Sequence, residues 1–232
     1  HPQNCLICPK NGRCELQKVA QDLGMHNPIR YDLDPRKGQE DASSPAIVRM
    51  PEKCILCGRC IEVCSSVQGI GVIAKENRGF DTLATLPYGK ALADTACINC
   101  GQCVQVCPTG ALSIHDDTVR IQEEFEAGKK LVIQVAPSVR INLAEALGEA
   151  PGAVSTGRLV SALKRLGFYR VFDTNFSADL TIMEEGTELL GRLKNGGKLP
   201  MFTSCCPAWV KYCETFAHDY TQHLSTCKSP QQ

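Results

Sequence analysis

The sequence of 232 residues predicts an α+β region rich in cysteine, followed by an α/β region built on a parallel sheet. Two observations predict this order. In the first half of the chain, cysteines recur with two or three residues between them. From about residue 125, short apolar runs rich in β-branched residues alternate with helix-length segments, a pattern typical of parallel sheets. We expect domains at residues 1–46, 47–122 and 123–232.

The composition narrows the class of protein. The 25 basic and 25 acidic residues cancel, so no excess charge favours a nucleic acid or an anionic membrane as partner. No apolar stretch reaches about 18 residues, so we expect no membrane-spanning helix. The opening residues HPQNC have no charged, apolar leader, and we expect no signal peptide. Cysteines at C-x-x-C spacing are typical of metal thiolates in a reducing compartment, so a cytoplasmic location is expected.

Two cysteine motifs in the middle of the chain share one spacing. Residues 54–64 read CILCGRCIEVC and residues 97–107 read CINCGQCVQVC, both C-x2-C-x2-C-x3-C. Bacterial ferredoxins with two [4Fe–4S] clusters have this spacing, and the fourth cysteine of each motif ligates the other cluster. Zinc rarely takes four cysteines at this spacing. We predict one cluster on Cys54, Cys57, Cys60 and Cys107, and a second on Cys97, Cys100, Cys103 and Cys64.

A third group of candidate ligands opens the chain. HPQNCLICPKNGRC spaces His1, Cys5, Cys8 and Cys14 as H-x3-C-x2-C-x5-C. Three thiolates leave one position of a four-iron cluster open, and we predict that His1 fills it; the alternative is that His1 belongs to a flexible chain end. A neutral imidazole in place of a thiolate removes a negative charge and should raise the reduction potential. The next residues, 15–24, are expected to form a short helix.

Three strands are expected in the second half, at LVIQVAP (131–137), YRVFDT (169–174) and LPMFTS (199–204). Binding sites in parallel sheets form beyond the carboxyl ends of the strands. We therefore expect one pocket to be faced by the residues that end the first and third strands, namely Ala136, Pro137, Ser138, Cys205 and Cys206.

Helices are expected between and after these strands. GRLVSALKRLG (157–167) has helical periodicity and ends on a capping glycine. The segment 177–197 is expected to form a long helix interrupted by Gly186. CCPAWVKYCETF (205–216) is expected to form a helix with Pro207 in its first turn.

The second half resembles the catalytic domain of [FeFe]-hydrogenases, and similarity to that family runs along the whole chain. The stretches that carry it are TSCCPAW (203–209), VAPSVR (135–140), FDTNFSADLTIMEEGTELLGRL (172–193) and LSTCKSPQQ (224–232). The N-terminal motif resembles a one-histidine, three-cysteine cluster domain shared with the large iron–sulfur subunit of respiratory complex I. In both families a [2Fe–2S] domain usually precedes it, so we expect that upstream sequence is missing.

This resemblance implies a function. The chain would be the N-terminal part of a hydrogenase catalytic subunit, in which three [4Fe–4S] clusters relay electrons to an H-cluster, a [4Fe–4S] cluster joined to a di-iron subsite. The reaction would be the reversible combination of two protons and two electrons into H₂. The electron partner would be ferredoxin, an NAD-reducing iron–sulfur or flavoprotein subunit, or a formate dehydrogenase module, within a complex of several subunits.

The resemblance also implies roles for single residues. Cys206 would ligate the H-cluster, whereas Cys205 would remain a free thiol that passes protons to the di-iron subsite. The proton route of the family maps onto Glu185, Glu188, Ser225 and Arg192, and positions lining the di-iron pocket map onto Ser138 and Gln231. On a helix, Glu185, Glu188 and Arg192 would share one face. The alternative for them is an ordinary solvated ion pair.

The sequence departs from the family in one respect. The cubane of the H-cluster needs three further cysteines, carried by motifs of the MPCxxK and CxGGC type, and neither motif occurs here. Cys213 and Cys227 are interpreted as packing residues instead. We expect a truncated catalytic subunit, or a partner chain that supplies the remainder. Two other functions stay open: a non-catalytic electron-transfer subunit of the complex I type, and a hydrogenase-like assembly or sensory protein without di-iron chemistry.

Overall fold

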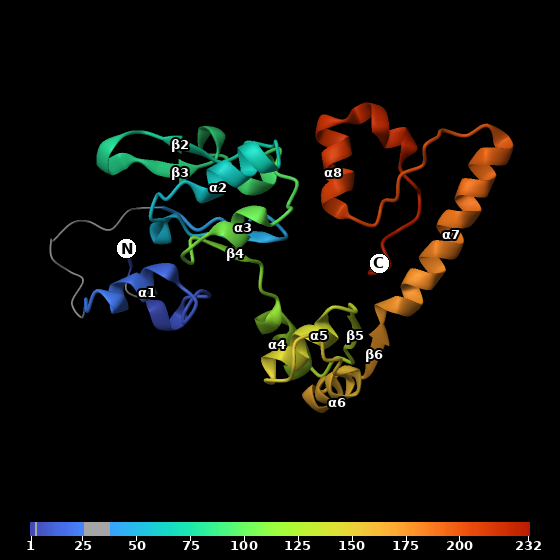
Figure 1. Cartoon of the computed structure of the whole chain (residues 1–232), viewed down its shortest axis with the longest axis horizontal. Helices are drawn as coiled ribbons and strands as arrows, with labels where there is room; N and C mark the ends of the chain where they lie inside the picture. Colours follow the sequence, from blue (N-terminus) through green and yellow to red (C-terminus); the bar gives the residue numbers. More distant parts are fainter. Residues whose placement is uncertain (3, 26–37) are drawn as a thin grey trace. The chain divides into compact units, whose positions relative to one another are not determined.

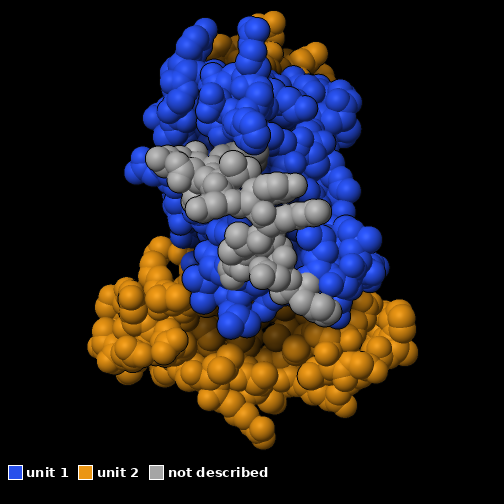
Figure 2. All heavy atoms as spheres, turned by 90° about the vertical axis from the view of Figure 1, so that its left-hand side faces the viewer, with its two compact units in different colours: residues 1–116 blue, residues 117–232 orange. Residues whose placement is uncertain are grey.

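The computed structural model describes residues 1–2, 4–25 and 38–232 (Figure 1). It divides into two compact units, His1–Asp116 and Asp117–Gln232 (Figure 2). The N-terminal motif and both middle motifs fall in the first unit, and the predicted strands and helices of the second half fall in the second. The finer boundaries expected at residues 46 and 122 stay a prediction.

The first unit is built on short antiparallel strands. β1 (Ile47–Arg49) pairs with β4 (Leu112–Ile114), and β2 (Ala74–Glu76) pairs with β3 (Leu83–Thr85). Apolar side chains from these strands and from the loops between them form its core, which consists of Ile47, Val72, Ile73, Leu86, Leu92, Cys97, Cys107, Ala111 and Leu112. Two cysteines of the predicted cluster motifs thus belong to the buried core.

The two middle motifs have the same backbone conformation. A short helix follows the second cysteine of each motif, α2 (Arg59–Glu62) in one and α3 (Gln102–Val106) in the other. Each helix begins after a glycine in the left-handed region, with φ of +79° at Gly58 and +75° at Gly101. A side chain would be strained at this φ, which explains why glycine stands at this motif position.

The N-terminal segment packs on this core. It contains a 3₁₀ turn (Cys5–Ile7) and α1 (Glu15–Asp22), so the predicted short helix is confirmed. The backbone N–H of Glu15 donates to the carbonyl of Pro108 at 3.0 Å. The Glu15 carboxylate also accepts two hydrogen bonds from the Arg59 guanidinium, at 2.7 and 2.9 Å. These contacts join the start of α1 to both middle motifs.

The second unit contains the predicted parallel sheet. β5 (Val132–Val135) pairs in parallel with β6 (Arg170–Asp173), from Val132 opposite Arg170 to Val135 opposite Asp173. α4 (Thr118–Glu126) precedes the sheet, and the crossover between its strands contains α5 (Val139–Ala146) and α6 (Thr156–Leu166). The predicted helix at 157–167 is confirmed, with Gly167 at φ +111° after its last residue.

Two expectations for this unit are wrong. Residues 199–204 do not join the described sheet; Phe202 forms a single parallel bridge with Leu224, because its N–H donates to His223 and its carbonyl accepts from Ser225. The long helix α7 (Thr174–Asn195) is continuous through Gly186. One glycine costs a helix only about 1 kcal/mol relative to alanine, and here the helix tolerates it.

The last helix, α8 (Pro207–Phe216), begins as predicted with Pro207 in its first turn and Cys206 as N-cap. α7 begins earlier than expected because the Asp173 carboxylate caps it, accepting from the N–H of Asn175 at 2.9 Å. Among the described helices, none is long and apolar enough to cross a membrane.

Candidate functional site

The first candidate site is a hollow in the first unit with about 520 Å³ of empty space, part of it open to solvent. Its walls are mostly apolar and include Ile55, Ile73 and Leu112. The cysteines that line it are Cys54, Cys57, Cys60 and Cys107. Three come from the first middle motif and one from the second, which is the combination that the spacing predicts for one cluster.

A second hollow, of about 440 Å³, lies beside the first. The cysteines that line it are Cys97, Cys100, Cys103 and Cys64, the set predicted for the other cluster. Three residues line both hollows and therefore form the wall between them: Arg49, Ile73 and Leu112. The guanidinium of Arg49 is largely buried in this wall and lies 3.5 Å from the Asp41 carboxylate. Arg49 was not predicted from the sequence, since no motif in the adjacent residues indicates a role for it.

Two thiols in these hollows have a raised pKa, one in each hollow. Burial, followed by the charges of Cys54, Cys107 and Cys57, raises the pKa of Cys60 to about 11. Burial and the neighbouring cysteines raise the pKa of Cys103 to about 12. Thiolates gathered in an apolar hollow need a cationic group among them, and iron supplies it. Two four-thiol sets in mostly apolar hollows therefore fit [4Fe–4S] clusters.

Backbone groups in both motifs point at cysteine sulfur. The N–H of Leu56 donates to Cys54 Sγ at 3.3 Å, and the N–H of Asn99 donates to Cys97 Sγ at 3.4 Å. Both donors have positive φ, 58° at Leu56 and 59° at Asn99. A leucine in this region is strained and persists only where the surrounding structure fixes it. Such N–H bonds stabilise thiolates and help set cluster potentials.

A single metal ion fits the described residues poorly. Within them, no group of three or more His, Cys, Asp or Glu side chains converges as ligands of one ion. A single zinc ion would draw its four thiolates to about 2.3 Å. In a four-iron cluster each thiolate binds a different iron, so the sulfurs stay farther apart. The geometry therefore favours clusters over zinc.

The predicted N-terminal ligands are less clearly gathered. His1 is exposed, and its Nδ1 lies 2.9 Å from the carbonyl of Pro2. Cys5, Cys8 and Cys14 are half-buried. Cys8 has a defined neighbour, since a Cβ built on Gly110 would lie 2.5 Å from its Sγ. Ligation by His1 stays a prediction.

In the second unit, Cys205 and Cys206 are exposed immediately before α8. Ala136, Pro137 and Ser138 follow β5, and Gln231 is exposed near the end of the chain. Neither of the hollows described above contains any of these residues. The pocket that they are predicted to share stays a prediction.

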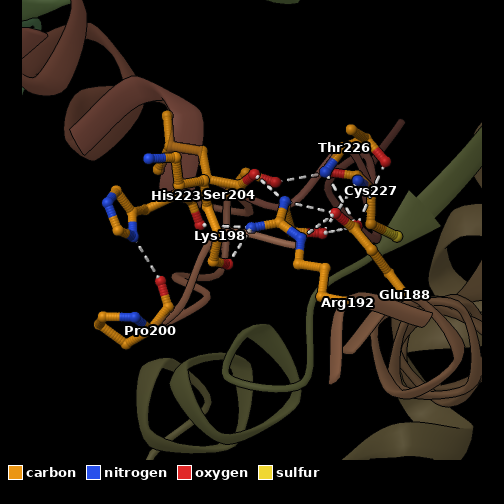
Figure 3. A network of polar contacts seen from close by, with 10 residues as sticks. Glu188, Arg192, Lys198, Pro200, Ser204, His223, Thr226 and Cys227 are labelled. Carbon is orange, nitrogen blue, oxygen red and sulfur yellow. Dashed lines mark hydrogen bonds and ion pairs between the residues drawn. The ribbon is translucent and has the colours of Figure 1, made fainter. Parts of the chain in front are cut away.

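Three of the predicted relay residues, Glu188, Arg192 and Ser225, are joined by hydrogen bonds in one network (Figure 3). Glu188 Oε1 accepts from Arg192 Nε at 3.0 Å and from Nη2 at 2.5 Å. Glu188 Oε2 accepts from Ser225 Oγ at 2.8 Å, from Thr226 N at 3.0 Å and from Thr226 Oγ1 at 3.2 Å. Arg192 in turn donates to the carbonyls of Leu224, His223 and Lys198. The pair is thus embedded in a network rather than solvated on an open helix face.

The two glutamates differ in their surroundings. Burial opposes ionisation of Glu188, but hydrogen bonds from Ser225, Arg192 and Thr226 outweigh it and lower its pKa. Glu185 Oε1 is buried and has no hydrogen-bond partner in the described part of the chain. Burial, followed by the negative charge of Glu185, raises the pKa of the Cys227 thiol. Glu188 is a fixed anion, whereas Glu185 has an acceptor free.

Two further residues, which sequence reasoning missed, tie the C-terminal segment in place. Ser204 Oγ donates to the carbonyl of Cys227 at 2.6 Å. Gln134, on β5, donates from Nε2 to the carbonyl of Pro230 at 2.7 Å. Residues 224–232 are therefore anchored both to the sheet and to the residue that precedes Cys205. Only contacts between distant segments identify these two residues.

The two interleaved four-cysteine hollows define an iron–sulfur protein with a ferredoxin-type module. In agreement, residues 53–111 match the 4Fe-4S dicluster domain, and residues 1–28 match the NADH-ubiquinone oxidoreductase-G iron-sulfur binding region. Residues 129–232 match the family described as iron only hydrogenase large subunit, C-terminal domain.

Two relatives are similar to this chain along its whole length. It is 48% identical to NADP-reducing hydrogenase subunit HndD of Solidesulfovibrio fructosivorans, and 37% identical to iron hydrogenase 1 of Clostridium pasteurianum. Both alignments cover 100% of this chain and 41% of the relative. Residues 129–232 match the iron only hydrogenase family, and the whole chain is similar to these relatives but spans about two fifths of their length.

A different kind of relative shares a smaller part of the chain. The cytosolic Fe-S cluster assembly factor narfl of Danio rerio is 38% identical over 45% of this chain and 26% of its own length. The similarity to this assembly factor thus covers less than half of the sequence.

Proposed function

We propose that this chain is part of an [FeFe]-hydrogenase, which catalyses the reversible formation of H₂ from two protons and two electrons. The match of residues 129–232 and the 48% identity along the whole chain support the proposal. The activity is proposed for the complete enzyme, because the chain spans 41% of the length of that relative.

Electron transfer is proposed to run through three [4Fe–4S] clusters. Two occupy the hollows of the first unit, with the ligand sets Cys54, Cys57, Cys60, Cys107 and Cys97, Cys100, Cys103, Cys64. The third is held by His1, Cys5, Cys8 and Cys14. The wall shared by the two hollows supports transfer between the first two clusters. The contact of Cys8 with Gly110, close to Cys107 in the chain, supports transfer from the third.

One observation carries the proposed proton route. Ser204, next to Cys205, donates to the carbonyl of Cys227 at 2.6 Å. The N–H of Cys227 donates to Ser225 Oγ at 3.1 Å, and that hydroxyl donates to Glu188. These hydrogen bonds link the residue before Cys205 to the Glu188–Arg192 pair through the backbone of Cys227. They support the proposal that the relay groups lie near the cysteine pair.

Each residue of the site has a proposed task. Cys206 is a ligand, Cys205 gives and takes protons through its exposed thiol, and Glu185 accepts a proton or a water at its free oxygen. Glu188 and Arg192 fix Ser225 in place at the outer end. When bound, the H-cluster supplies the centre at which electrons and protons combine. Ala136, Pro137, Ser138 and Gln231 are proposed to line its pocket.

Partners and location are proposed on the same basis. The similarity to an NADP-reducing hydrogenase subunit favours a complex of several subunits with an NAD(P)-linked iron–sulfur or flavoprotein partner. Ferredoxin and a formate dehydrogenase module are the alternative electron partners. We propose a cytoplasmic location, which the many thiols at metal-binding spacing favour.

Exchange of each cysteine of the pair for serine tests the proposal in the complete, matured enzyme. Cys205→Ser should leave iron content near normal and cut H₂ evolution severely, because a serine hydroxyl does not ionise near the working pH as a thiol does. Cys206→Ser should lower iron content, because oxygen is a poorer ligand for this iron than sulfur. The measurements are iron content, EPR and H₂ evolution on both variants.

Two outcomes would contradict this division of tasks. If Cys205→Ser lost iron while Cys206→Ser kept it, the two roles would be reversed. If neither change affected H₂ evolution, a role in electron transfer or in cluster assembly would replace the catalytic one.

A further inference from the structure

A buried lysine stands directly before the first ligand of the middle motifs. Lys53 is 4% exposed, in a 3₁₀ turn (Pro51–Lys53) that precedes Cys54. Its ammonium donates to Met50 Sδ at 3.0 Å, and a thioether is a weak acceptor. Among the residues that the structure describes, no carboxylate pairs with it. A buried ammonium is costly unless an anion compensates it, so an anionic group is expected nearby.

The Lys53 side chain lies on the side of the N-terminal motif. Both side chains lie next to Gly110, because a Cβ built on this glycine would lie 2.5 Å from Cys8 Sγ and 3.5 Å from Lys53 Cδ. The aliphatic stem of Lys53 and the sulfur of Cys8 therefore meet over the same glycine. Lys53 lines neither of the two hollows that hold the other eight cysteines. The stem of Lys53 therefore lies beside Cys8, one of the predicted N-terminal ligands.

The backbone around this contact is well fixed. Thr109 is 1% exposed, and its hydroxyl donates to the carbonyl of Lys53 at 2.8 Å. One residue earlier, the carbonyl of Pro108 accepts from the N–H of Glu15, which begins the helix after Cys14. Residues 108–110 thus contact both Lys53 and the N-terminal segment.

We propose that Lys53 is the counter-charge of the N-terminal iron–sulfur centre and raises its reduction potential. The inference rests on the proposed function, which places a cluster on Cys8. Thiolates and sulfides give such a centre negative charge, and reduction adds one more electron. A fixed positive charge nearby stabilises the reduced form, and burial keeps solvent and salt from screening it.

The test is a redox titration of the whole chain, reconstituted anaerobically and followed by EPR. Loss of a signal in Cys8→Ser assigns that signal to the N-terminal centre. Lys53→Met keeps the length of the stem and removes the charge, so the midpoint of this signal should move to more negative potential. A shift of at least about tenfold in the reduction equilibrium is expected, which is 59 mV for one electron. Lys53→Arg should stay near the wild-type value.

Lys90→Met is the matched control, because it removes the same charge from an exposed position and should leave all midpoints unchanged. If Lys53→Met loses the centre while Lys53→Arg keeps it, the charge is required and the proposal holds. Loss in both variants, or an unchanged midpoint in Lys53→Met, overturns it. Only two centres in the wild-type chain would instead remove the N-terminal cluster, and with it both this inference and that part of the proposed function.

Discussion

Replacement of Glu188 by glutamine should increase the local opening of the C-terminal segment around Thr226. The carboxylate accepts from two groups of donors: Arg192 at Oε1, and Ser225 with Thr226 at Oε2. A glutamine has one oxygen, so its NH₂ must face one of these groups. It cannot face Arg192, which has only donors. The amide nitrogen will therefore turn to Ser225 and Thr226, whose hydroxyls can rotate to accept.

One donor cannot adapt to this change. The backbone N–H of Thr226 donates to Glu188 Oε2 at 3.0 Å and loses its acceptor in Glu188→Gln. An unsatisfied buried donor costs about 1–3 kcal/mol. Thr226 is exposed, so water replaces part of the lost bond, and we expect about 1–2 kcal/mol. Since 1.4 kcal/mol is tenfold, local opening should increase about 5- to 30-fold.

The effect should depend on pH with a definite sign. The pKa of Glu188 is lowered from its ordinary value of 4.5 in the folded protein, chiefly by hydrogen bonds that outweigh the effect of burial. Its contribution to stability is therefore present above about pH 4.5 and is lost as the pH falls through the lowered pKa. Wild type and Glu188→Gln should differ at neutral pH and converge in acid.

Hydrogen exchange of the Thr226 and Cys227 amides, corrected for intrinsic rates, measures the opening directly. Glu184→Gln is the matched control, because it removes the same charge from an exposed position of α7. Equal exchange in Glu188→Gln and Glu184→Gln would refute the reasoning. So would a difference that persists unchanged into acid.

Three further results are expected from the first unit, each measured by EPR-monitored redox titration of the reconstituted chain. Gly110→Ala should abolish the N-terminal centre and spare the other two, because its methyl would lie 2.5 Å from Cys8 Sγ, whereas Gly157→Ala, with no atom within 4 Å, should change nothing. Arg49→Gln should lower the potentials of both ferredoxin-type centres, since Arg49 lines both hollows and carries a positive charge; a shift in only one would contradict this. His1→Cys should keep the N-terminal centre and lower its potential, and an unchanged midpoint would mean that His1 is not a ligand.

Local signals explain why most helices could be predicted from the sequence. α6 ends at Gly167 and α8 starts at Pro207, and both are residues whose backbone preferences act within one turn. The helix α7 begins earlier than predicted because Asp173, the last residue of β6, also caps the helix, so that it begins directly at Thr174. The interruption predicted at Gly186 does not occur, because a single glycine weakens a helix without ending it.

Pairing between segments that are distant in the sequence explains why other features were predicted wrongly or not at all. The strand expected at 199–204 has the right composition, but its backbone groups are taken by residues 223–225 rather than by β5 or β6. The sequence of residues 199–204 does not itself indicate that they pair with residues 223–225. In the same way, the two four-cysteine sets were predictable because a local spacing is repeated, whereas Arg49 and Lys53 were not, because only the folded chain buries them.

The adjacent cysteines before α8 show how local backbone geometry constrains function. Cys206 has φ −94° and ψ 110°, an extended conformation, as the N-cap of the helix. In extended backbone, successive side chains point to opposite sides, which disfavours ligation of one metal ion by both Cys205 and Cys206. The hydrogen bond from Ser204 to Cys227 holds the residue before this pair in place. The extended backbone at Cys206 therefore supports the proposal that the two neighbouring cysteines have separate tasks, one as a ligand and one as a proton carrier.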